Sequence, residues 1–178
     1  MQADTLTMNI RQARPDDAAL LLNIYGPVVK DSTASFELTV PTVDEFSDRI
    51  ASSIKNHEWV VMEHKDRLIG YAYATAHRVR EAYKYSVETS VYIHADHRGQ
   101  RIGKKLYESL FSSLQGMDFH NAYAGITLPN PGSVALHKSL GFKPIGVFEE
   151  IGFKLGSWHD VSWWQRKISD IAATSPAQ

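Results

Sequence analysis

The feature that most constrains the fold is a strand pattern joined to a helix pattern by a short basic loop. Residues 85–93 alternate apolar or β-branched side chains with polar ones, which is typical of a strand with two different faces. Glu88 then lies on the face opposite Val87. Residues 100–114 repeat apolar side chains at a spacing of four, which predicts an amphipathic helix. A strand that leads directly into a helix indicates a sheet covered by helices.

The rest of the chain carries the same two kinds of pattern. Helices are expected after Pro15, after Thr42 and from Asn130 to Leu140. Further strands are expected at residues 8–14, 59–63, 68–76, 122–128, 142–149 and 152–166. The order β-α-α-β-β-β-α-β-α-β-β predicts one mixed α/β (α+β) domain over residues 1–170. Residues 1–6 and 171–178 are expected to be frayed ends.

The charge balance and the absence of cysteine exclude several classes of function. The 178 residues include 19 Lys and Arg against 20 Asp and Glu, so no overall positive field favours nucleic acid or an anionic membrane. Without cysteine, disulfides, thiolate metal ligands and a covalent thiolate nucleophile are excluded. The sequence shows neither a membrane span nor a signal peptide, so a cytoplasmic location is expected.

The loop between the long strand and the helix has the character of an anion site. Cations at a helix N-terminus oppose the helix dipole, whereas a bound phosphate would favour both the dipole and the cations. Gly99 and Gly103 would let the backbone approach such an anion closely. The alternative is a solvated basic helix end whose glycines serve turning and packing. The cations are Arg98, Arg101, Lys104 and Lys105.

Two motifs make the chain resemble the GNAT N-acetyltransferases. The first is the run Arg98, Gly99, Gln100, Arg101, Ile102 and Gly103, which is similar to the family's pyrophosphate loop and departs from it at Arg101, where the family usually has glycine. The second runs from Leu128-Pro129-Asn130 to Leu140-Gly141-Phe142. The resemblance implies acetyl-CoA as the acetyl donor. It also implies a central mixed, mostly antiparallel sheet of about seven strands flanked by four helices.

Further blocks between Thr33 and Gln165 resemble one branch of that family, the phosphinothricin and methionine sulfoximine acetyltransferases. These blocks include Thr33–Phe36, Arg80–Tyr83, Val87–Tyr92 and Gly156–Val161. The branch implies N-acetylation of a small amino-acid-like acceptor in a ternary complex. It also implies a homodimer with active sites near the subunit interface.

The resemblance assigns catalytic candidates to residues of this chain. Glu88 corresponds to the general base of the branch and His137 to a histidine of its active centre. From the strand pattern alone, Glu88 would be a carboxylate on a polar, half-exposed face, and His137 a surface histidine. Tyr107 either protonates the departing thiolate or packs its ring in the core.

The remaining candidates bind the two substrates. A backbone N–H near Val91, Tyr92 or Ile93 is expected to hold the thioester carbonyl, and Lys104 belongs with the pyrophosphate loop. Asn130 is expected to reach the pantetheine arm, to cap the following helix, or both. For the acceptor, Arg78, Arg80 and Tyr83 form a loop suited to an anionic group, and Phe36 walls the side chain. The two arginines can equally be solvated loop residues.

Two other clusters are expected to have no chemical role. His94 and His97 lack a third ligand, so no metal site is expected. Trp158, Trp163 and Trp164 are expected in the core or at a subunit interface. The alternatives to the leading function are a GNAT enzyme acting on another amine, such as a protein N-terminus or a polyamine, and a non-catalytic acetyl-CoA-binding module.

Overall fold

The computed structural model describes residues 8–169 of the chain. The ends expected to fray lie outside the described residues. Seven strands form one sheet in the order β1-β2-β3-β4-β5-β7-β6. All neighbouring strands pair antiparallel except β4 and β5, which are parallel. The strands are β1 (Asn9–Gln12), β2 (Trp59–His64), β3 (Arg67–Ala76), β4 (Ser86–Ile93), β5 (Asn121–Thr127), β6 (Lys143–Lys154) and β7 (Ser157–Lys167).

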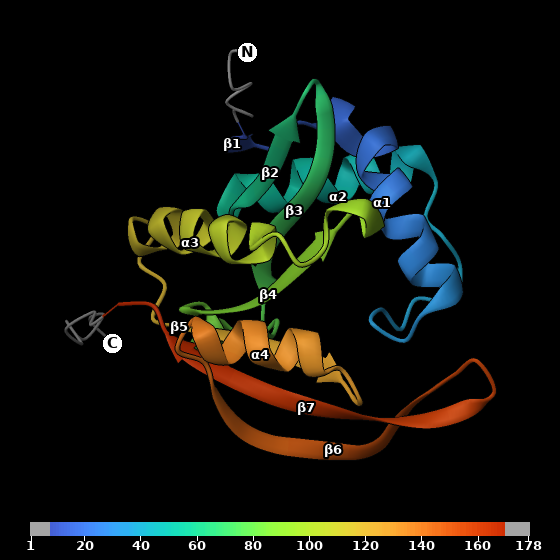
Figure 1. The fold of residues 1–178 in the computed structure, drawn as a ribbon. Helices are drawn as coiled ribbons and strands as arrows, with labels where there is room; N and C mark the ends of the chain where they lie inside the picture. The colour runs from blue at the N-terminus through green and yellow to red at the C-terminus, as the bar shows by residue number, and fades with distance from the viewer. Residues whose placement is uncertain (1–7, 170–178) are drawn as a thin grey trace.

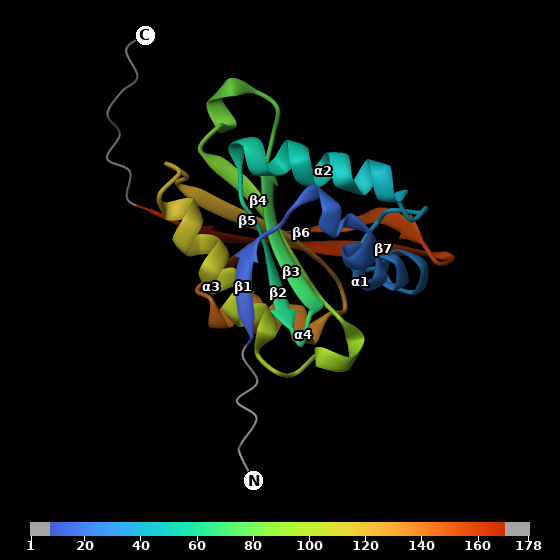
Figure 2. The same ribbon diagram turned by 90° about the horizontal axis from the view of Figure 1, so that it is seen from above.

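Four α-helices cover the two faces of this sheet. Helices α1 (Ala18–Asp31) and α2 (Val43–Asn56) lie on one face, and α3 (Ile102–Gln115) and α4 (Pro131–Ser139) on the other (Figures 1 and 2). Each face buries its own hydrophobic cluster, one beneath α1 and α2 and one beneath α3. Three short 3₁₀ turns, Pro15–Asp17, Glu81–Tyr83 and Ala95–His97, lie between the longer elements.

Local signals in the sequence fix most helix boundaries. Thr42 and Glu45 form a reciprocal capping box at the start of α2. Gly141 follows α4 with a φ of +82°, the left-handed conformation that commonly ends a helix. Helix α3 begins at Ile102, two residues later than expected, because Arg101 has a left-handed backbone with a φ of 60°.

The predicted boundary between the last two strands was wrong. Strand β6 continues through Glu150, which the sequence pattern placed in a connection between strands. Glu150 has a φ of 48° inside a register shift, so the chain bulges there and resumes pairing. The tight turn comes at Leu155 and Gly156, both at positive φ. The result is a long β6–β7 hairpin at the edge of the sheet (Figure 1).

The expected alternation of β4 is confirmed. Val87 is fully buried in the cluster beneath α3. Glu88 is on the opposite face, as is Tyr92, which contacts Tyr25 of α1. The central strand therefore presents Glu88 to the face covered by α1 and α2. No helix within residues 8–169 is long and apolar enough to cross a membrane.

Candidate active site

Strands β4 and β5 pair over only three residues and then diverge. The parallel register runs from Ser86 to Glu88 and stops there. His77 N–H donates to the Ser86 carbonyl and His94 N–H to the Ile69 carbonyl, so the even-numbered residues of β4 direct their backbone groups to β3. The N–H groups of Val91 and Ile93 consequently face the diverging side, whereas that of Tyr92 faces β3.

The basic loop leads from this divergence to the start of α3. Arg101, the N-cap residue of α3, makes no side-chain capping hydrogen bond, and the first turn of the helix holds no acidic residue. The first N–H groups of the helix are therefore available to an anion. The residues around this helix end are exposed, namely Arg98, Gly99, Gln100 and Arg101. Nζ of Lys104 in the first turn lies 3.9 Å from Glu108 Oε1.

The two glycines of the loop have different roles. Gly99 has a φ of +76° and open space where a side chain would begin, so it serves the turn. Gly103 is buried, and a Cβ there would lie 3.1 Å from Leu136 Cδ2. Its missing side chain therefore allows α3 to approach α4. The neighbouring residue, Ile102, is buried in the core beneath α3.

Asn130 caps α4, which confirms one of its two expected roles. Its Oδ1 accepts a hydrogen bond from the Ser133 N–H at 3.0 Å. The following residue, Pro131, is the first of the helix. This cap fixes the start of the helix that carries His137.

His137 and Tyr107 form a buried, neutral pair between α4 and α3. His137 Nδ1 lies 2.8 Å from the Ser133 carbonyl oxygen, so Nδ1 carries the proton. Its Nε2 then accepts a hydrogen bond from the Tyr107 hydroxyl at 3.1 Å. Burial raises the pKa of Tyr107 and lowers that of His137, so both side chains are uncharged near neutral pH.

Glu88 is the last residue of β4 that pairs with β5, next to the divergence. Its side chain is 38% exposed, and Oε2 is 3.6 Å from His77 Nδ1. Burial raises the pKa of Glu88, while His77 and then Arg78 oppose that shift by favouring the carboxylate. A carboxyl group with a raised pKa is suited to accept a proton near neutral pH.

The residues expected to bind the acceptor come from two separate segments. Arg78, Arg80 and Tyr83 all lie on the connection from β3 to β4, which leads into Glu88, and all three are exposed. Phe36 lies on the connection from α1 to α2 and is 38% exposed. Its ring reaches Gly152 of β6 and lies 6.3 Å from the His159 ring of β7.

A buried lysine ties the same two segments together. Lys154, near the tip of the β6–β7 hairpin, donates from Nζ to the Ser35 carbonyl at 2.6 Å. Burial lowers its pKa. The position of Phe36 is therefore set jointly by its own loop and by the distant hairpin.

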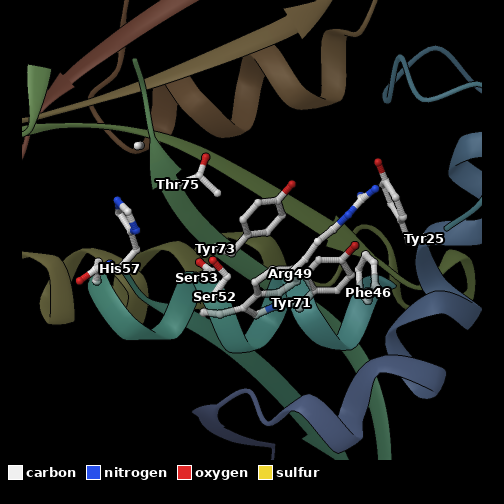
Figure 3. Close-up of a pocket in the computed structure, with 12 residues that line it drawn as sticks. Tyr25, Phe46, Arg49, Ser52, Ser53, His57, Tyr71, Tyr73 and Thr75 are labelled. Carbon is white, nitrogen blue, oxygen red and sulfur yellow. The ribbon is translucent and has the colours of Figure 1, made fainter. Parts of the chain in front are cut away.

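A cleft of about 460 Å³ lies between α2 and the sheet (Figure 3). Its wall includes Tyr73 and Thr75 of β3, and Thr75 is directly opposite Glu88 in the β3–β4 register. Arg49 lines the cleft from α2 and forms an ion pair with Glu37. The cleft therefore lies on the same face of the sheet as Glu88. Residues 8–169 hold no group of three or more His, Asp or Glu side chains placed to bind a metal ion.

Comparison with known proteins agrees with this geometry. The acetyltransferase (GNAT) domain family matches residues 10–163, which is most of the chain. The protein is a GNAT acetyltransferase. It is 33% identical over 178 residues to a phosphinothricin N-acetyltransferase of Streptomyces viridochromogenes, a match that covers 100% of this chain and 97% of that protein.

This GNAT acetyltransferase has two further informative relatives. It is 32% identical over 167 residues to an L-methionine sulfoximine/L-methionine sulfone acetyltransferase of Salmonella typhimurium, covering 93% of this chain and 98% of that protein. A crystal structure of a Sinorhizobium meliloti phosphinothricin acetyltransferase in complex with acetyl-CoA superposes with a TM-score of 0.90 at 35% identity. That match covers 97% of this chain and 95% of the other. The expected family, fold and N-acetyltransferase class are confirmed.

Three residues that contact the candidate site residues or line the cleft could not be found from the sequence. His77 was part of no motif, and its contact with Glu88 depends on the pairing register of β3 and β4. Tyr73 depends on the same register, since it is opposite Ser90. Lys154 reaches Ser35 across 119 positions of sequence. No local pattern reports contacts of this kind.

Proposed function

We propose that the protein transfers the acetyl group of acetyl-CoA to the α-amino group of a small amino-acid-like acceptor, of the phosphinothricin or methionine sulfoximine type. The observation that carries the proposal is the position of Glu88. It is the last residue paired with β5, and the N–H groups of Val91 and Ile93 follow it on the diverging strand. A proton acceptor and the N–H donors for the carbonyl thus lie within a few residues of one another on one strand. The relatives named above act on acceptors of this type.

The chain offers groups that fit each part of acetyl-CoA. The uncapped N-terminus of α3 and the surrounding cations suit the pyrophosphate. The N–H groups of Val91 and Ile93 suit the thioester carbonyl. Asn130, whose Oδ1 caps α4, would bind the pantetheine arm through its side-chain amide. Acetyl-CoA supplies an activated thioester carbonyl. The proposed pyrophosphate site consists of Arg98, Gly99, Gln100, Arg101, Ile102, Gly103 and Lys104.

Glu88 acts as the general base in this proposal. An α-amino group with a pKa of about 8 is only about one-tenth neutral at pH 7, so removing its proton is worth about 1.4 kcal/mol. Glu88 takes that proton, directly or through water. The nitrogen lone pair then forms the new C–N bond, and the C–S electron pair leaves with sulfur. The nitrogen loses its second proton as the amide forms, which compensates for the proton that the departing thiolate takes up. Because the chain has no cysteine, the simplest route is direct transfer in a ternary complex.

Tyr107 is the candidate proton donor to the departing sulfur. Its raised pKa keeps the hydroxyl protonated. In this structure that proton is donated to His137 Nε2, so the O–H must turn from His137 to the sulfur during the step. Tyr107→Phe separates this role from packing. A lowered kcat with unchanged thermal stability supports proton donation. An unchanged kcat with lowered stability leaves only the packing role, with His137 as its hydrogen-bond partner.

The acceptor site is proposed to lie between Arg78, Arg80 and Tyr83 on one side and Phe36 on the other. The arginines would bind the acceptor's anionic groups. Arg78 also favours the ionised form of Glu88. Both arginines lie on the connection that leads into β4, so an anionic acceptor bound to them would lie at the same end of β4 as the base.

We also propose that the protein is a homodimer that buries the β6–β7 hairpin. Strand β6 is an edge of the sheet. A monomer with such an edge would present a large apolar surface and unpaired backbone groups to water. The apolar residues there, each 46% to 59% exposed, are Ile145, Val147, Phe148, Ile151, Phe153 and Trp158.

Sedimentation of the wild type and of Phe148→Glu tests this interface. We expect a dimer that the glutamate converts to a monomer. A monomeric wild type would overturn the proposal. Because Lys154 and Gly152 link this hairpin to the loop carrying Phe36, the monomeric variant should also have a raised acceptor KM.

The central test is the release of free thiol from acetyl-CoA in the presence of candidate acceptors. Phosphinothricin, methionine sulfoximine and methionine sulfone are compared with ordinary amino acids, a polyamine and a peptide with a free N-terminus. Glu88→Gln should lower kcat by about 10² to 10⁴-fold. Glu81→Gln, at an exposed acid on the connection that leads into β4, is the matched control. Release with the polyamine or peptide alone would point to the other acceptors, and stabilisation by acetyl-CoA without any release would indicate a binding module.

A further inference from the structure

His77 lies beside Glu88 because of the register of two antiparallel strands. It follows Ala76, the last residue of β3, and its N–H donates to the Ser86 carbonyl at 3.3 Å. His77 is therefore opposite Ser86 and diagonal to Glu88 on the same face of the sheet. The distance from His77 Nδ1 to Glu88 Oε2 is 3.6 Å.

Aromatic rings hold the imidazole of His77 in place. It stacks on Tyr123 of β5 with ring centroids 4.5 Å apart, and its edges meet Trp163 of β7 and Tyr83. The side chain is only 15% exposed. A ring held on three sides has little rotational freedom, so it presents Nδ1 to Glu88 in a fixed direction.

No other group competes for that nitrogen in the described part of the chain. Nδ1 of His77 is buried and makes no hydrogen bond. The acceptor beside it is Glu88 Oε2, which at 3.6 Å lies just beyond hydrogen-bonding distance. A buried N–H without a partner is unfavourable, so a small movement of the carboxylate that closes the gap is favoured.

We propose that His77 is a positioning residue that holds Glu88 Oε2 through Nδ1–H, leaving Oε1 to take the proton of the acceptor amine. This inference rests on the proposed role of Glu88 as base. His77 neither gains nor loses a proton in the step. The amine proton goes to Glu88 alone, and the imidazole keeps the carboxylate in one orientation.

The proposal fixes the sign of a pH effect. Besides His77, the groups that interact electrostatically with Glu88 are Arg78, and Tyr73 of β3. Tyr123 is opposite Glu88 in the β4–β5 register, and both Tyr123 and Tyr83 contact the His77 ring. Burial raises the pKa of Glu88, and His77 is the largest opposing influence, ahead of Arg78. Removing the imidazole should therefore raise the pKa of Glu88 further.

The experiment compares His77→Leu with His77→Asn. The two replacements have nearly the same shape, but only asparagine places an N–H donor near the former Nδ1. We expect His77→Leu to lower kcat for methionine sulfoximine about ten-fold with little change in the acetyl-CoA KM. The acid limb of kcat/KM should move to higher pH. His77→Asn should restore most of kcat and the part of the pH shift that a hydrogen-bond donor supplies. His64→Leu, at another histidine whose Nδ1 is buried without a partner, should change neither.

A second measurement does not depend on turnover. Titration of ¹³C-carboxyl-labelled glutamate, with Glu88 assigned by Glu88→Gln, should show a higher Glu88 pKa in His77→Leu than in His77→Asn. Equal pKa values and equal kcat in those two variants would overturn the role of His77. If Glu88→Gln retains full activity, the proposed base is wrong. If Glu88→Gln is inactive while the two His77 variants are equal, only the role of His77 is wrong.

Discussion

Gly152 offers a sharp test of whether the β6–β7 hairpin shapes the proposed acceptor site. A Cβ at this position would lie 2.6 Å from Phe36 Cζ and 2.8 Å from Cδ2, whereas ordinary contacts begin at 3.4 Å. In Gly152→Ala the Phe36 ring must therefore retreat by about 1 Å, and misplacement of this size can cost about 10²-fold in rate. Because the ring is already 38% exposed, the free energy of unfolding should change by less than about 0.5 kcal/mol.

Steady-state kinetics with each substrate varied in turn measures the effect. We expect kcat/KM for the acceptor to fall by roughly 10- to 100-fold while the KM for acetyl-CoA stays constant. Gly146→Ala is the matched control, since it lies on the same strand with nothing within 4 Å of the added Cβ. Equal acceptor kinetics in the two variants would show that Phe36 does not shape the acceptor site.

Three further predictions concern the cap of α4, the basic loop and the base. Asn130→Ala should lower the free energy of unfolding by about 1 kcal/mol, seen as a melting temperature roughly 2–4 °C lower, whereas Asn130→Asp should retain the cap. Arg101→Gly should raise the free energy of unfolding by up to about 1 kcal/mol, because glycine adopts the left-handed φ of 60° freely. Arg101→Ala keeps the backbone strain, so it should raise the acetyl-CoA KM without changing the free energy of unfolding. The acid limb of kcat/KM should lie above the ordinary glutamate value of about 4.3, because burial raises the pKa of Glu88 and activity is lost as pH falls through it; a limb at or below that value would contradict the assignment.

The helices and strands of the candidate site could be predicted from the sequence better than the contacts between them. Alternation along β4 placed Glu88 on its face, and the Asn130-Pro131 pair predicted the start of α4. The roles of the two loop glycines were not separable from sequence. Only the packing of α3 against α4 shows that Gly103 faces Leu136 while Gly99 serves a turn.

The predicted end of β6 was wrong for the same reason, namely that it depends on contact with another element. A residue at positive φ can end a strand or form a bulge within it, and the choice depends on whether the partner strand continues beyond it. Strand β7 continues, so Glu150 bulges and the turn moves to Leu155 and Gly156.

The sequence by itself determined most of the periodic elements and helix caps, the basic loop and the face that carries Glu88, because each depends on residues within a few positions of one another. The tertiary structure alone decided which distant side chains meet. His77 reaches Glu88 through the β3–β4 register, Tyr107 meets His137 through helix packing, and Lys154 holds the loop of Phe36 from the far hairpin. Such contacts depend on strand register and on the packing of whole elements, which no local pattern of side chains records.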